Sequence, residues 1–450
     1  MDLSNIIKAY DVRGVFPDEF NEETATRIGA AFGAFVDADE VLVGHDCRLS
    51  SPAIRDALID GITSQGVDVR LIGEIPTDML YYASGALSLP GVVITASHNP
   101  AQYNGLKFCQ ARAAPIGADT GLEDIRRMAE EGLDAVEVRG TVREESVVEG
   151  YIDHVLRVAG ADGILNLTVA ADGGNGMAGV VLARVFDRID AELIGLYLEP
   201  DGAFPNHPAD PLRPENLLDL VALVDAERPD FGVAFDGDAD RAFFIDDEGV
   251  PLPGSTTTAI IADWFLSTQP GSTIVYNLIC SRAVPETVLA AGGVPVRTKV
   301  GHSYIKQVMA ESGAVFGGEH SGHYYFRDNF NADSGITAML VLLRVLSDAR
   351  VSLSELRRRY EPYVQSGEIN FDVKNKEEAD ASVERAFERY TVDRLDGLTV
   401  DLGDRWFNLR PSNTESVLRL NVEAPDEAAV GELVAMVSVI IQSVIIKEES

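Results

Sequence analysis

The sequence predicts an α/β protein of three or four domains, the last of which is a smaller α+β domain. Short apolar strands alternate with helical patterns over most of the chain, as in layered α/β folds. The 450 residues exceed what one hydrophobic core usually supports. From about residue 366 onward a charged segment and two β-like runs replace the alternation, so the tail is expected to form a domain of a different type.

The strands of the α/β part are predicted from short apolar runs. They lie at residues 41–43, 167–171, 231–235, 273–276 and 314–316. After the first run, Ser51 is expected to cap a helix that has Pro52 at its first position. The longest apolar stretch, residues 433–446, is shorter than a membrane span and contains Ser438, Gln442 and Ser443. It is therefore expected to be a packed terminal helix.

The chain is strongly acidic. It has 37 lysines and arginines against 72 aspartates and glutamates, a formal net charge of −35. Such a charge repels polyanions, so neither nucleic acid nor an anionic membrane is expected as a partner. The cysteines, Cys47, Cys109 and Cys280, are scattered and form no CxxC pair. With no basic and apolar leader at the N-terminus, the sequence predicts a cytoplasmic protein.

Three aspartates, Asp236, Asp238 and Asp240, alternate directly after the apolar run FGVAF. If the strand geometry persists, their carboxylates converge on one point and need a hard cation such as Mg²⁺. A calcium loop of the EF-hand type needs glycine and glutamate where this chain has Arg241 and Asp247, so that alternative fails. A solvated acidic turn remains open, although an arginine beside the loop indicates an anionic ligand.

Another apolar strand runs into TASHNP and presents Ser97 beside His98. Taken alone, this stretch is typical of a capped turn. A serine hydrolase would need glycines on both sides of its nucleophile, and Ser97 has none. Ser321 fails the same test, because Glu319 and His323 occupy those places.

A G-x-G-x-x-G pattern, formed by Gly174, Gly176 and Gly179, follows a predicted strand and precedes a helical pattern. Glu192 or Glu199 lies at a distance suited to a ribose contact, so a dinucleotide site is one interpretation. Glycines in this setting also serve tight turns and close helix packing, and both interpretations stay open here.

Two further loops carry dense polar groups. RPSNTES offers a guanidinium, hydroxyls and backbone N–H groups between two strands, which suits a dianionic phosphate. GEHSGH offers a carboxylate, a hydroxyl and imidazoles, which suit vicinal hydroxyls and proton transfer. The alternative for RPSNTES is an ordinary hairpin loop, and the alternative for GEHSGH is a glycine-rich surface turn.

Five motifs in this order, KAYDVRG, TASHNP, DGDADR, GEHSGH and RPSNTE, resemble the α-D-phosphohexomutase family in its bacterial phosphomannomutase/phosphoglucomutase form. The resemblance covers essentially the whole chain. It implies three α/β domains with mixed sheets and a smaller C-terminal α+β domain around a central cleft. The expected domains are residues 1–150 with a phosphoserine loop, 151–253 with a metal-binding loop, 254–365 with a sugar-binding loop, and 366–450 with a phosphate-binding loop.

The resemblance also implies roles for single residues. Ser97 is expected to carry a phosphoryl group, and Asp236, Asp238 and Asp240 to hold Mg²⁺ together with one of its oxygens. Lys107 or His323 is expected to exchange the hydroxyl proton of the substrate. The implied catalytic residues are Ser97, His98, Lys107, Arg13 and His323. The implied substrate-binding residues are Tyr10, Arg241, Lys299, His302, Glu319, Ser321, His323, Arg410, Ser412, Asn413 and Thr414.

The implied activity is that of an enzyme that moves a phosphate between C1 and C6 of mannose, and of glucose as well. Phosphoserine and a hexose 1,6-bisphosphate, which also acts as activator, are the implied intermediates. Glucosamine-specific members tend to carry glycine in place of Asn413, which disfavours glucosamine phosphate. Some members of the family place a lysine just ahead of an arginine where this chain has Ile279 or its neighbours before Arg282, so one cation found in those members is missing. A monomer or a homodimer is expected.

Other activities stay open at this point. The main substrate could be glucose phosphate or glucosamine phosphate, or the chain could bind a sugar phosphate without turning it over. The intact Ser97, the complete aspartate trio and Lys107 argue against such a binder. A nicotinamide-dependent oxidoreductase rests only on the three glycines.

Overall fold

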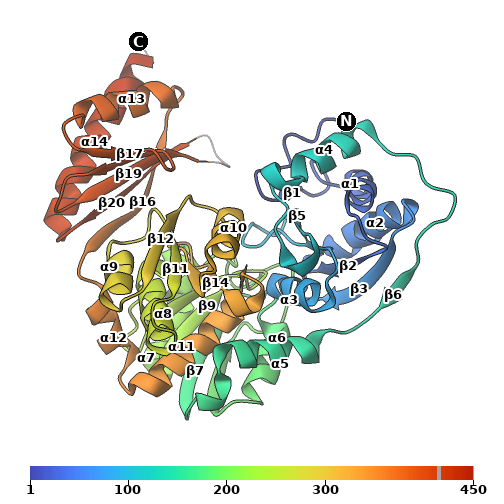
Figure 1. Cartoon of the computed structure of the whole chain (residues 1–450), viewed down its shortest axis with the longest axis horizontal. Helices are drawn as coiled ribbons and strands as arrows, with labels where there is room; N and C mark the ends of the chain where they lie inside the picture. The colour runs from blue at the N-terminus through green and yellow to red at the C-terminus, as the bar shows by residue number, and fades with distance from the viewer. Residues whose placement is uncertain (413–416, 449–450) are drawn as a thin grey trace.

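The computed structural model describes residues 1–412 and 417–448, and at residues 302, 391 and 447–448 the backbone alone. Its strands form four sheets in chain order (Figure 1). The first three sheets are mixed and carry helices, and the fourth is antiparallel. The predicted class, three α/β domains and a smaller α+β domain, is confirmed.

The first sheet places two functional loops side by side. Its strand order is β1-β5-β4-β2-β3-β6, and β2 runs parallel to β4. Because parallel neighbours end at the same edge, the loops after β2 and β4 lie together there. The strands are β1 (Val12–Val15), β2 (Glu40–His45), β3 (Asp68–Glu74), β4 (Gly91–Ile94), β5 (Tyr103–Cys109) and β6 (Val142–Glu144). The helices are α1 (Glu22–Phe35), α2 (Ser51–Ser64), α3 (Thr77–Leu87), α4 (Leu122–Glu131) and the short turns η1 (Ala111–Ala113) and η2 (Ala118–Thr120).

The second sheet, ordered β10-β9-β7-β8, supplies the aspartate loop. Strand β9 is buried along its whole length and lies parallel to β7, and it turns directly into antiparallel β10. The strands are β7 (Leu167–Asp172), β8 (Ala191–Leu196), β9 (Phe231–Phe235) and β10 (Ala242–Asp246). The helices are α5 (Val148–Ala159), η3 (Ala161–Gly163), α6 (Gly179–Phe186), η4 (Pro214–Leu217) and α7 (Leu218–Glu227).

The third sheet, ordered β12-β11-β13-β14-β15, carries the GEHSGH loop between β13 and β14. The strands are β11 (Thr273–Asn277), β12 (Val294–Thr298), β13 (Phe316–Gly318), β14 (Tyr324–Phe326) and β15 (Ala332–Asp333). The helices are α8 (Gly254–Thr268), α9 (Ala283–Ala290), α10 (His302–Ser312), η5 (Arg327–Asn329), α11 (Gly335–Ala349) and α12 (Leu353–Tyr360).

The fourth sheet, ordered β16-β20-β19-β18-β17, lies apart from the others in Figure 1, with α13 and α14 on its outer side. The two β-like runs around RPSNTES are β19 and β20. The strands are β16 (Val364–Asp372), β17 (Thr391–Asp393), β18 (Leu398–Asp401), β19 (Trp406–Pro411) and β20 (Val417–Ala424), and the helices are α13 (Lys376–Ala386) and α14 (Glu427–Glu448).

The terminal helix α14 packs on this sheet, as predicted. Leu433, Val437 and Ile441 are fully buried in the core of the fourth domain, at the four-residue spacing of one helix face. By length and composition alone α14 could cross a membrane, and 28% of its most apolar segment is buried. Its buried stripe identifies it as a core helix, while Met436 and Val439 remain exposed.

Domains one to three share a hydrophobic core, and α11 lies within it. Leu80 of α3, Tyr151 of α5, Phe244 of β10 and Ile336 of α11 belong to one buried cluster. The first and fourth domains each have a core of their own as well. The shared core fixes the loops of the first three sheets relative to one another, whereas the core of the fourth domain is a separate cluster.

Asp78 joins the first three domains. Its Oδ2 accepts hydrogen bonds from the Tyr151 hydroxyl at 2.6 Å and the Ser334 hydroxyl at 2.5 Å. No hydrogen-bond donor among the described residues reaches its buried Oδ1. Burial raises the pKa of Asp78 to about 7, against the lowering effect of the two hydroxyls. The folded protein therefore keeps this carboxyl mostly protonated and neutral below about pH 7.

We expect Asp78→Asn to remove a pH-dependent loss of stability. The unfolded carboxyl titrates near its ordinary value of 3.8. The folded state therefore binds the proton more tightly, and its stability falls as pH rises from about 4 to 7, by on the order of 4 kcal/mol from this group. Melting temperatures of both proteins at pH 5 and pH 8 measure this. The melting temperature of the variant relative to that of the wild type should be higher at pH 8 than at pH 5. The exposed control Asp225→Asn should show no such change, and an Asp78→Asn difference independent of pH would contradict the account.

Two details of the sequence-based prediction are wrong. Ser51 is the first residue of α2 and not its cap, because Ser50 precedes the helix. The Ser51 hydroxyl instead donates a hydrogen bond to Asp46 Oδ1 and accepts one from Asn104 Nδ2. The strand predicted at residues 314–316 is β13, which begins only at Phe316. Ala314 is buried but does not belong to the strand, so its apolar character led to a predicted start two residues too early.

Candidate active site

The loop after β4 holds Ser97 in a strained conformation. Ser97 has a φ of 52°, in the left-handed region that side chains with a Cβ rarely adopt. The Ser97 backbone N–H donates to Thr95 Oγ1 at 2.9 Å, and only 3% of the residue is exposed. The turn places its hydroxyl towards the second domain.

Arg48, in the loop after β2, stabilises this turn through hydrogen bonds to its backbone. The fully buried guanidinium donates to four backbone carbonyls of the serine loop, those of Ser97, Asn99, Pro100 and Tyr103, at 2.7 to 3.0 Å. Asp46 Oδ2 fixes its Nε at 3.1 Å. Sequence reasoning missed Arg48; the available signal was a charged HDCR stretch that follows a strand in the same way as the other three loops.

We expect Arg48→Met to destabilise the protein by about 3 kcal/mol or more, because four carbonyls would lose their donor at a buried site. Thermal unfolding measures the effect. The control Arg139→Met removes an arginine that also donates to a backbone carbonyl, that of Asp60, but at the surface. Equal melting temperatures for the two variants would show that Arg48 does not support the loop.

The aspartate loop after β9 meets the serine loop. Asp236, Asp238 and Asp240 are buried, and one carboxylate oxygen from each lies within 4.8 Å of the others. The Ser97 hydroxyl donates to Asp236 Oδ2 at 2.7 Å. Gly237 permits this approach, since a Cβ there would lie 2.4 Å from the Ser97 carbonyl oxygen.

Two cationic side chains, those of Lys107 and Arg241, contact this acidic group. Lys107 Nζ donates to Asp238 Oδ2 at 2.7 Å and to Asp240 Oδ2 at 2.5 Å. Arg241 Nε donates to Asp236 Oδ2 at 2.8 Å, and its Nη2 lies 3.5 Å from the Ser97 hydroxyl. The cluster therefore has more buried carboxylates than buried cations in direct contact with them.

The pKa values of these groups depend on two opposing effects: burial disfavours the charged form, and neighbouring opposite charges favour it. Burial raises the pKa of Asp236 to about 7, although Arg241 lowers it. Burial also acts to raise the pKa of Asp240, but Lys107 and then His323 lower it to about 2. For Lys107, burial acts against the charge, yet the neighbouring carboxylates raise the pKa well above its ordinary value.

The aspartate loop fits a hard divalent cation. Asp238 Oδ1 and Asp240 Oδ1 are buried, and no donor among the described residues hydrogen-bonds to them. Carboxylate oxygens are the ligands that Mg²⁺ prefers in proteins. The group can therefore bind a metal ion.

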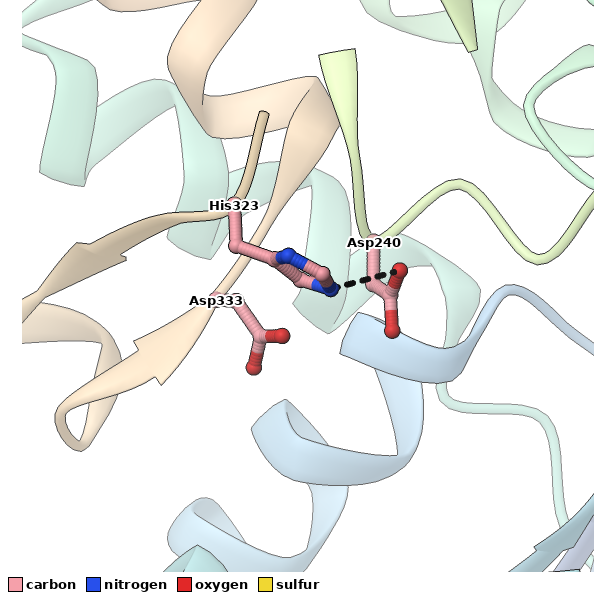
Figure 2. Close-up of side chains that lie close together, drawn as sticks. All are labelled: Asp240, His323 and Asp333. Carbon is pink, nitrogen blue, oxygen red and sulfur yellow. Dashed lines mark ion pairs between the residues drawn. The ribbon is translucent and has the colours of Figure 1, made fainter. Parts of the chain in front are cut away.

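A second acidic group surrounds His323, which immediately precedes β14 (Figure 2). Its Nε2 lies 3.7 Å from Asp240 Oδ1, and its Nδ1 lies 3.0 Å from the Ser321 hydroxyl. Asp333 completes the group, but its carboxylate already pairs with the buried Lys306 ammonium at 2.7 Å. Asp240 belongs to both groups, so His323 lies beside the aspartate loop.

A cleft of about 560 Å³ is lined by residues of all four domains. Of the serine, aspartate and GEHSGH loops, the last alone contributes lining residues, His320 and Ser321. Tyr10, Ser321 and Arg410, for which the sequence predicts substrate binding, are among its lining residues. Glu319 does not line it. The buried Glu319 carboxylate instead accepts from Asn277 Nδ2 at 2.9 Å and the Tyr325 hydroxyl at 2.6 Å.

The fourth domain contributes two arginines to the cleft. Arg410 on β19 and Arg419 on β20 are direct cross-strand partners. Sequence reasoning missed Arg419, because a turn symmetric about RPSNTES would place Arg419 opposite Phe407 and not opposite Arg410. Ser412 is buried, and its backbone N–H donates to the Val417 carbonyl. Asn413 and Thr414 lie outside the described residues.

The remaining predicted residues flank the centre. The His98 ring lies 3.3 Å from the Ser97 hydroxyl, and burial, then Arg241 and Arg13, lowers its pKa well below the ordinary value. Arg13 donates to Asn99 Oδ1. Lys299 Nζ lies 5.6 Å from the centre of the Tyr304 ring. His302 begins α10, and its side chain is not among those described.

The glycine pattern has a packing role. A Cβ at Gly176 would lie 2.6 Å from the Gly237 carbonyl oxygen, and one at Gly179 would lie 1.6 Å from that of Leu198. Gly174 adopts a φ of 52°. These glycines thus allow the turn and the close contact with the aspartate loop, which accounts for the pattern without a dinucleotide.

Known proteins resemble the chain over nearly its whole length. Four domain families match it, described as phosphoglucomutase/phosphomannomutase alpha/beta/alpha domains I, II and III and the C-terminal domain, at residues 4–134, 149–249, 253–363 and 368–439. A phosphomannomutase of Salmonella typhimurium is 41% identical over 430 residues, which cover 93% of this chain and 94% of the relative. A phosphomannomutase of Methanocaldococcus jannaschii is 34% identical, covering 95% and 96%.

Solved structures agree. A phosphoglucomutase/phosphomannomutase family protein from Burkholderia thailandensis superimposes with a TM-score of 0.90 at 33% identity, covering 99% of this chain and 98% of the other. A putative phosphomannomutase from Thermus thermophilus has a TM-score of 0.84 over 98% of this chain and 100% of its own, and its 24% identity supports the fold alone. The chain therefore belongs to the phosphoglucomutase/phosphomannomutase family.

Proposed function

We propose that the protein interconverts mannose 6-phosphate and mannose 1-phosphate, and also acts on glucose phosphates, as an intramolecular phosphotransferase. The names of its relatives from Salmonella and Methanocaldococcus support mannose as the substrate. The observation that carries the proposal is the position of the Ser97 hydroxyl. It lies 2.7 Å from an aspartate of a metal-binding loop and 3.5 Å from the Arg241 guanidinium. A phosphoryl group on this oxygen would lie between a metal site and a fixed cation.

Asp236, Asp238 and Asp240 would hold Mg²⁺ together with an oxygen of phospho-Ser97. The bound ion supplies positive charge that offsets the negative charge on the transferring phosphoryl oxygens. Arg241 offsets the same charge from the protein side. Phosphoryl transfer depends mainly on such positioning and neutralisation, so no further functional group is needed at the phosphorus.

In the first half of the reaction, a substrate hydroxyl attacks phospho-Ser97. The bond between phosphorus and Ser97 Oγ breaks as the bond to the sugar oxygen forms, and the hydroxyl proton passes to His323, which lies 3.7 Å from the aspartate loop. Lys107 does not accept it, because, against the effect of burial, the neighbouring carboxylates raise its pKa and keep it protonated. The product of this half is a hexose 1,6-bisphosphate.

In the second half, the bisphosphate turns over in the cleft and presents its other phosphate to Ser97. The bond from that phosphorus to the sugar oxygen breaks, the bond to Ser97 Oγ forms again, and the sugar oxygen takes back the proton. Added hexose 1,6-bisphosphate would therefore phosphorylate the free serine, which makes it an activator.

Other residues would hold the parts of the substrate that do not react. Arg410, Ser412, Asn413 and Thr414, with Lys299 and His302, are proposed for the distant phosphate. Tyr10, Arg13, His98, Glu319 and Ser321 complete the proposed site. For Glu319 this requires an exchange of partners, since Asn277 and Tyr325 hold its carboxylate. We expect the fourth domain to close on the substrate and exclude water from phospho-Ser97.

An activity assay tests the proposal. The purified protein with Mg²⁺ and a trace of hexose 1,6-bisphosphate receives mannose 1-phosphate, glucose 1-phosphate or glucosamine 1-phosphate, and formation of the 6-phosphate is followed. Conversion supports a mutase, and the ratio of kcat/KM values identifies the preferred sugar. Binding without conversion of any of the three would instead support a sugar-phosphate-binding protein.

The protein's partners, location and oligomeric state are also proposals. A net charge of −35 disfavours nucleic acid and anionic membranes, and we propose a cytoplasmic monomer or homodimer. Light scattering on the purified protein distinguishes these two states.

A further inference from the structure

Thr77, the first residue of α3, contacts the aspartate loop of the second domain at two points. Its hydroxyl donates to Asp238 Oδ2 at 2.6 Å, and its backbone N–H donates to the Asp238 carbonyl at 3.0 Å. Both residues are fully buried. The first domain thus holds the main chain and the side chain of a residue proposed as a metal ligand.

The two oxygens of the Asp238 carboxylate differ in their surroundings. Lys107 Nζ donates to Oδ2 at 2.7 Å, so together with Thr77 this oxygen has two donors. A carboxylate oxygen offers two lone pairs, and both are occupied at Oδ2. No donor among the described residues hydrogen-bonds to the buried Oδ1. Asp238 therefore presents a single oxygen to a cation.

Lys107 alone would not hold Asp238 in this way, because a second carboxylate shares it. Its Nζ also donates to Asp240 Oδ2 at 2.5 Å. The Thr77 hydroxyl, by contrast, donates to Asp238 alone among the described residues. Loss of this hydroxyl would free one lone pair of Oδ2, on a carboxylate whose other oxygen is already available. Thr77 therefore decides whether Asp238 offers one oxygen or two.

The number of oxygens that a carboxylate offers discriminates between divalent cations. Mg²⁺ requires near-ideal octahedral coordination at short distances, whereas the larger Ca²⁺ takes more oxygens and accepts carboxylates that bind through both of theirs. A carboxylate restricted to one oxygen favours Mg²⁺. A carboxylate that can use both oxygens favours Ca²⁺.

We propose that Thr77 selects Mg²⁺ over Ca²⁺ at the aspartate loop by restricting Asp238 to one oxygen. Thr77 is a positioning residue, since it acts through Asp238 and is not itself a ligand. Residues that hydrogen-bond to a metal ligand typically change metal affinity by about 10- to 100-fold, which sets the size of the expected effect. This role rests on the metal site of the proposed function and deepens it by assigning the choice of cation to one residue.

Thr77→Ala and Thr77→Ser test this, because the two variants differ from each other in the hydroxyl alone. Calorimetric titrations with Mg²⁺ and with Ca²⁺, at constant ionic strength and without sugar, give the ratio of the two Kd values for each protein. We expect the wild type and Thr77→Ser to bind Mg²⁺ more tightly than Ca²⁺, and Thr77→Ala to lose about tenfold of this preference. The rise in melting temperature that each cation causes should show the same change.

Thr256→Ala is the matched control. Thr256 is also a buried threonine near the start of a helix, α8, and its hydroxyl donates to a carboxylate oxygen, Glu361 Oε1, at 2.9 Å. Glu361 does not belong to the aspartate loop, so this variant should keep the wild-type ratio of Kd values.

Three results would overturn the proposal. Equal losses of Mg²⁺ and Ca²⁺ affinity in Thr77→Ala would show that Thr77 only supports the loop. An equal change of the ratio in Thr77→Ser and Thr77→Ala would assign the effect to the methyl group. A wild type that binds Ca²⁺ as tightly as Mg²⁺ would exclude selection without any variant. The titrations need no turnover, so a wild type that selects Mg²⁺ but converts no sugar would refute the proposed function alone.

Discussion

Ser97→Ala should lower kcat by about 10³-fold or more with either mannose or glucose phosphate, because the variant has no oxygen to carry the phosphoryl group. Melting temperature should change little, since the hydroxyl is lost from a loop whose backbone Arg48 still holds. Steady-state assays with saturating Mg²⁺ and hexose 1,6-bisphosphate measure the effect. Intact-mass spectrometry after incubation with the bisphosphate should find one phosphoryl group on the wild type and none on the variant.

The control for Ser97→Ala is Ser267→Ala, which removes an exposed hydroxyl that donates to the Trp264 carbonyl near the end of α8. It should retain wild-type rates. A Ser97→Ala protein that keeps more than a tenth of the wild-type kcat would show that another group carries the phosphate.

Asp238→Asn should lower kcat by about 10²-fold or more and raise the Mg²⁺ concentration needed for activity. The carboxylate has Thr77 and Lys107 on one oxygen and no hydrogen-bond donor among the described residues on the other, which is the oxygen suited to the metal. Chelation of Mg²⁺ should abolish wild-type activity, and added Mg²⁺ should restore it.

The Mg²⁺-dependent shift in melting temperature tests the same role of Asp238 without requiring turnover. Mg²⁺ should raise the melting temperature of the wild type, because an ion bound only by the folded state stabilises it, and this shift should vanish in Asp238→Asn. The exposed Asp225→Asn should keep both the shift and the activity. Equal Mg²⁺-dependent shifts in Asp238→Asn and the wild type would place the metal elsewhere.

The local parts of the site were predictable from sequence. The spacing of Asp236, Asp238 and Asp240 after a buried strand predicted a convergent carboxylate group, and their oxygens do lie together. The apolar run before Ser97 predicted a strand that presents this serine at its end, and Ser97 does follow β4. In each case the information lies within ten residues, where strand periodicity determines the direction of side chains.

Long-range contacts could not be predicted in the same way. Arg48 binds carbonyls about fifty residues further along the chain, and nothing in its own neighbourhood specifies them. Glu368 reaches Arg410 through a register shift that the sequence does not indicate. The Glu319 carboxylate accepts a hydrogen bond from the Asn277 amide, 42 residues earlier, which the GEHSGH stretch itself does not specify. Such pairings depend on which strands become neighbours.

The most direct test of the account is a single-turnover transfer from the serine. Wild-type protein carrying radiolabelled phosphate on Ser97 is mixed with excess unlabelled mannose 1-phosphate and Mg²⁺, and the label is followed by chromatography. The account predicts that the label leaves the protein for mannose 1,6-bisphosphate and then mannose 6-phosphate. Label that stays on the protein, or that appears only as inorganic phosphate, would contradict transfer through Ser97.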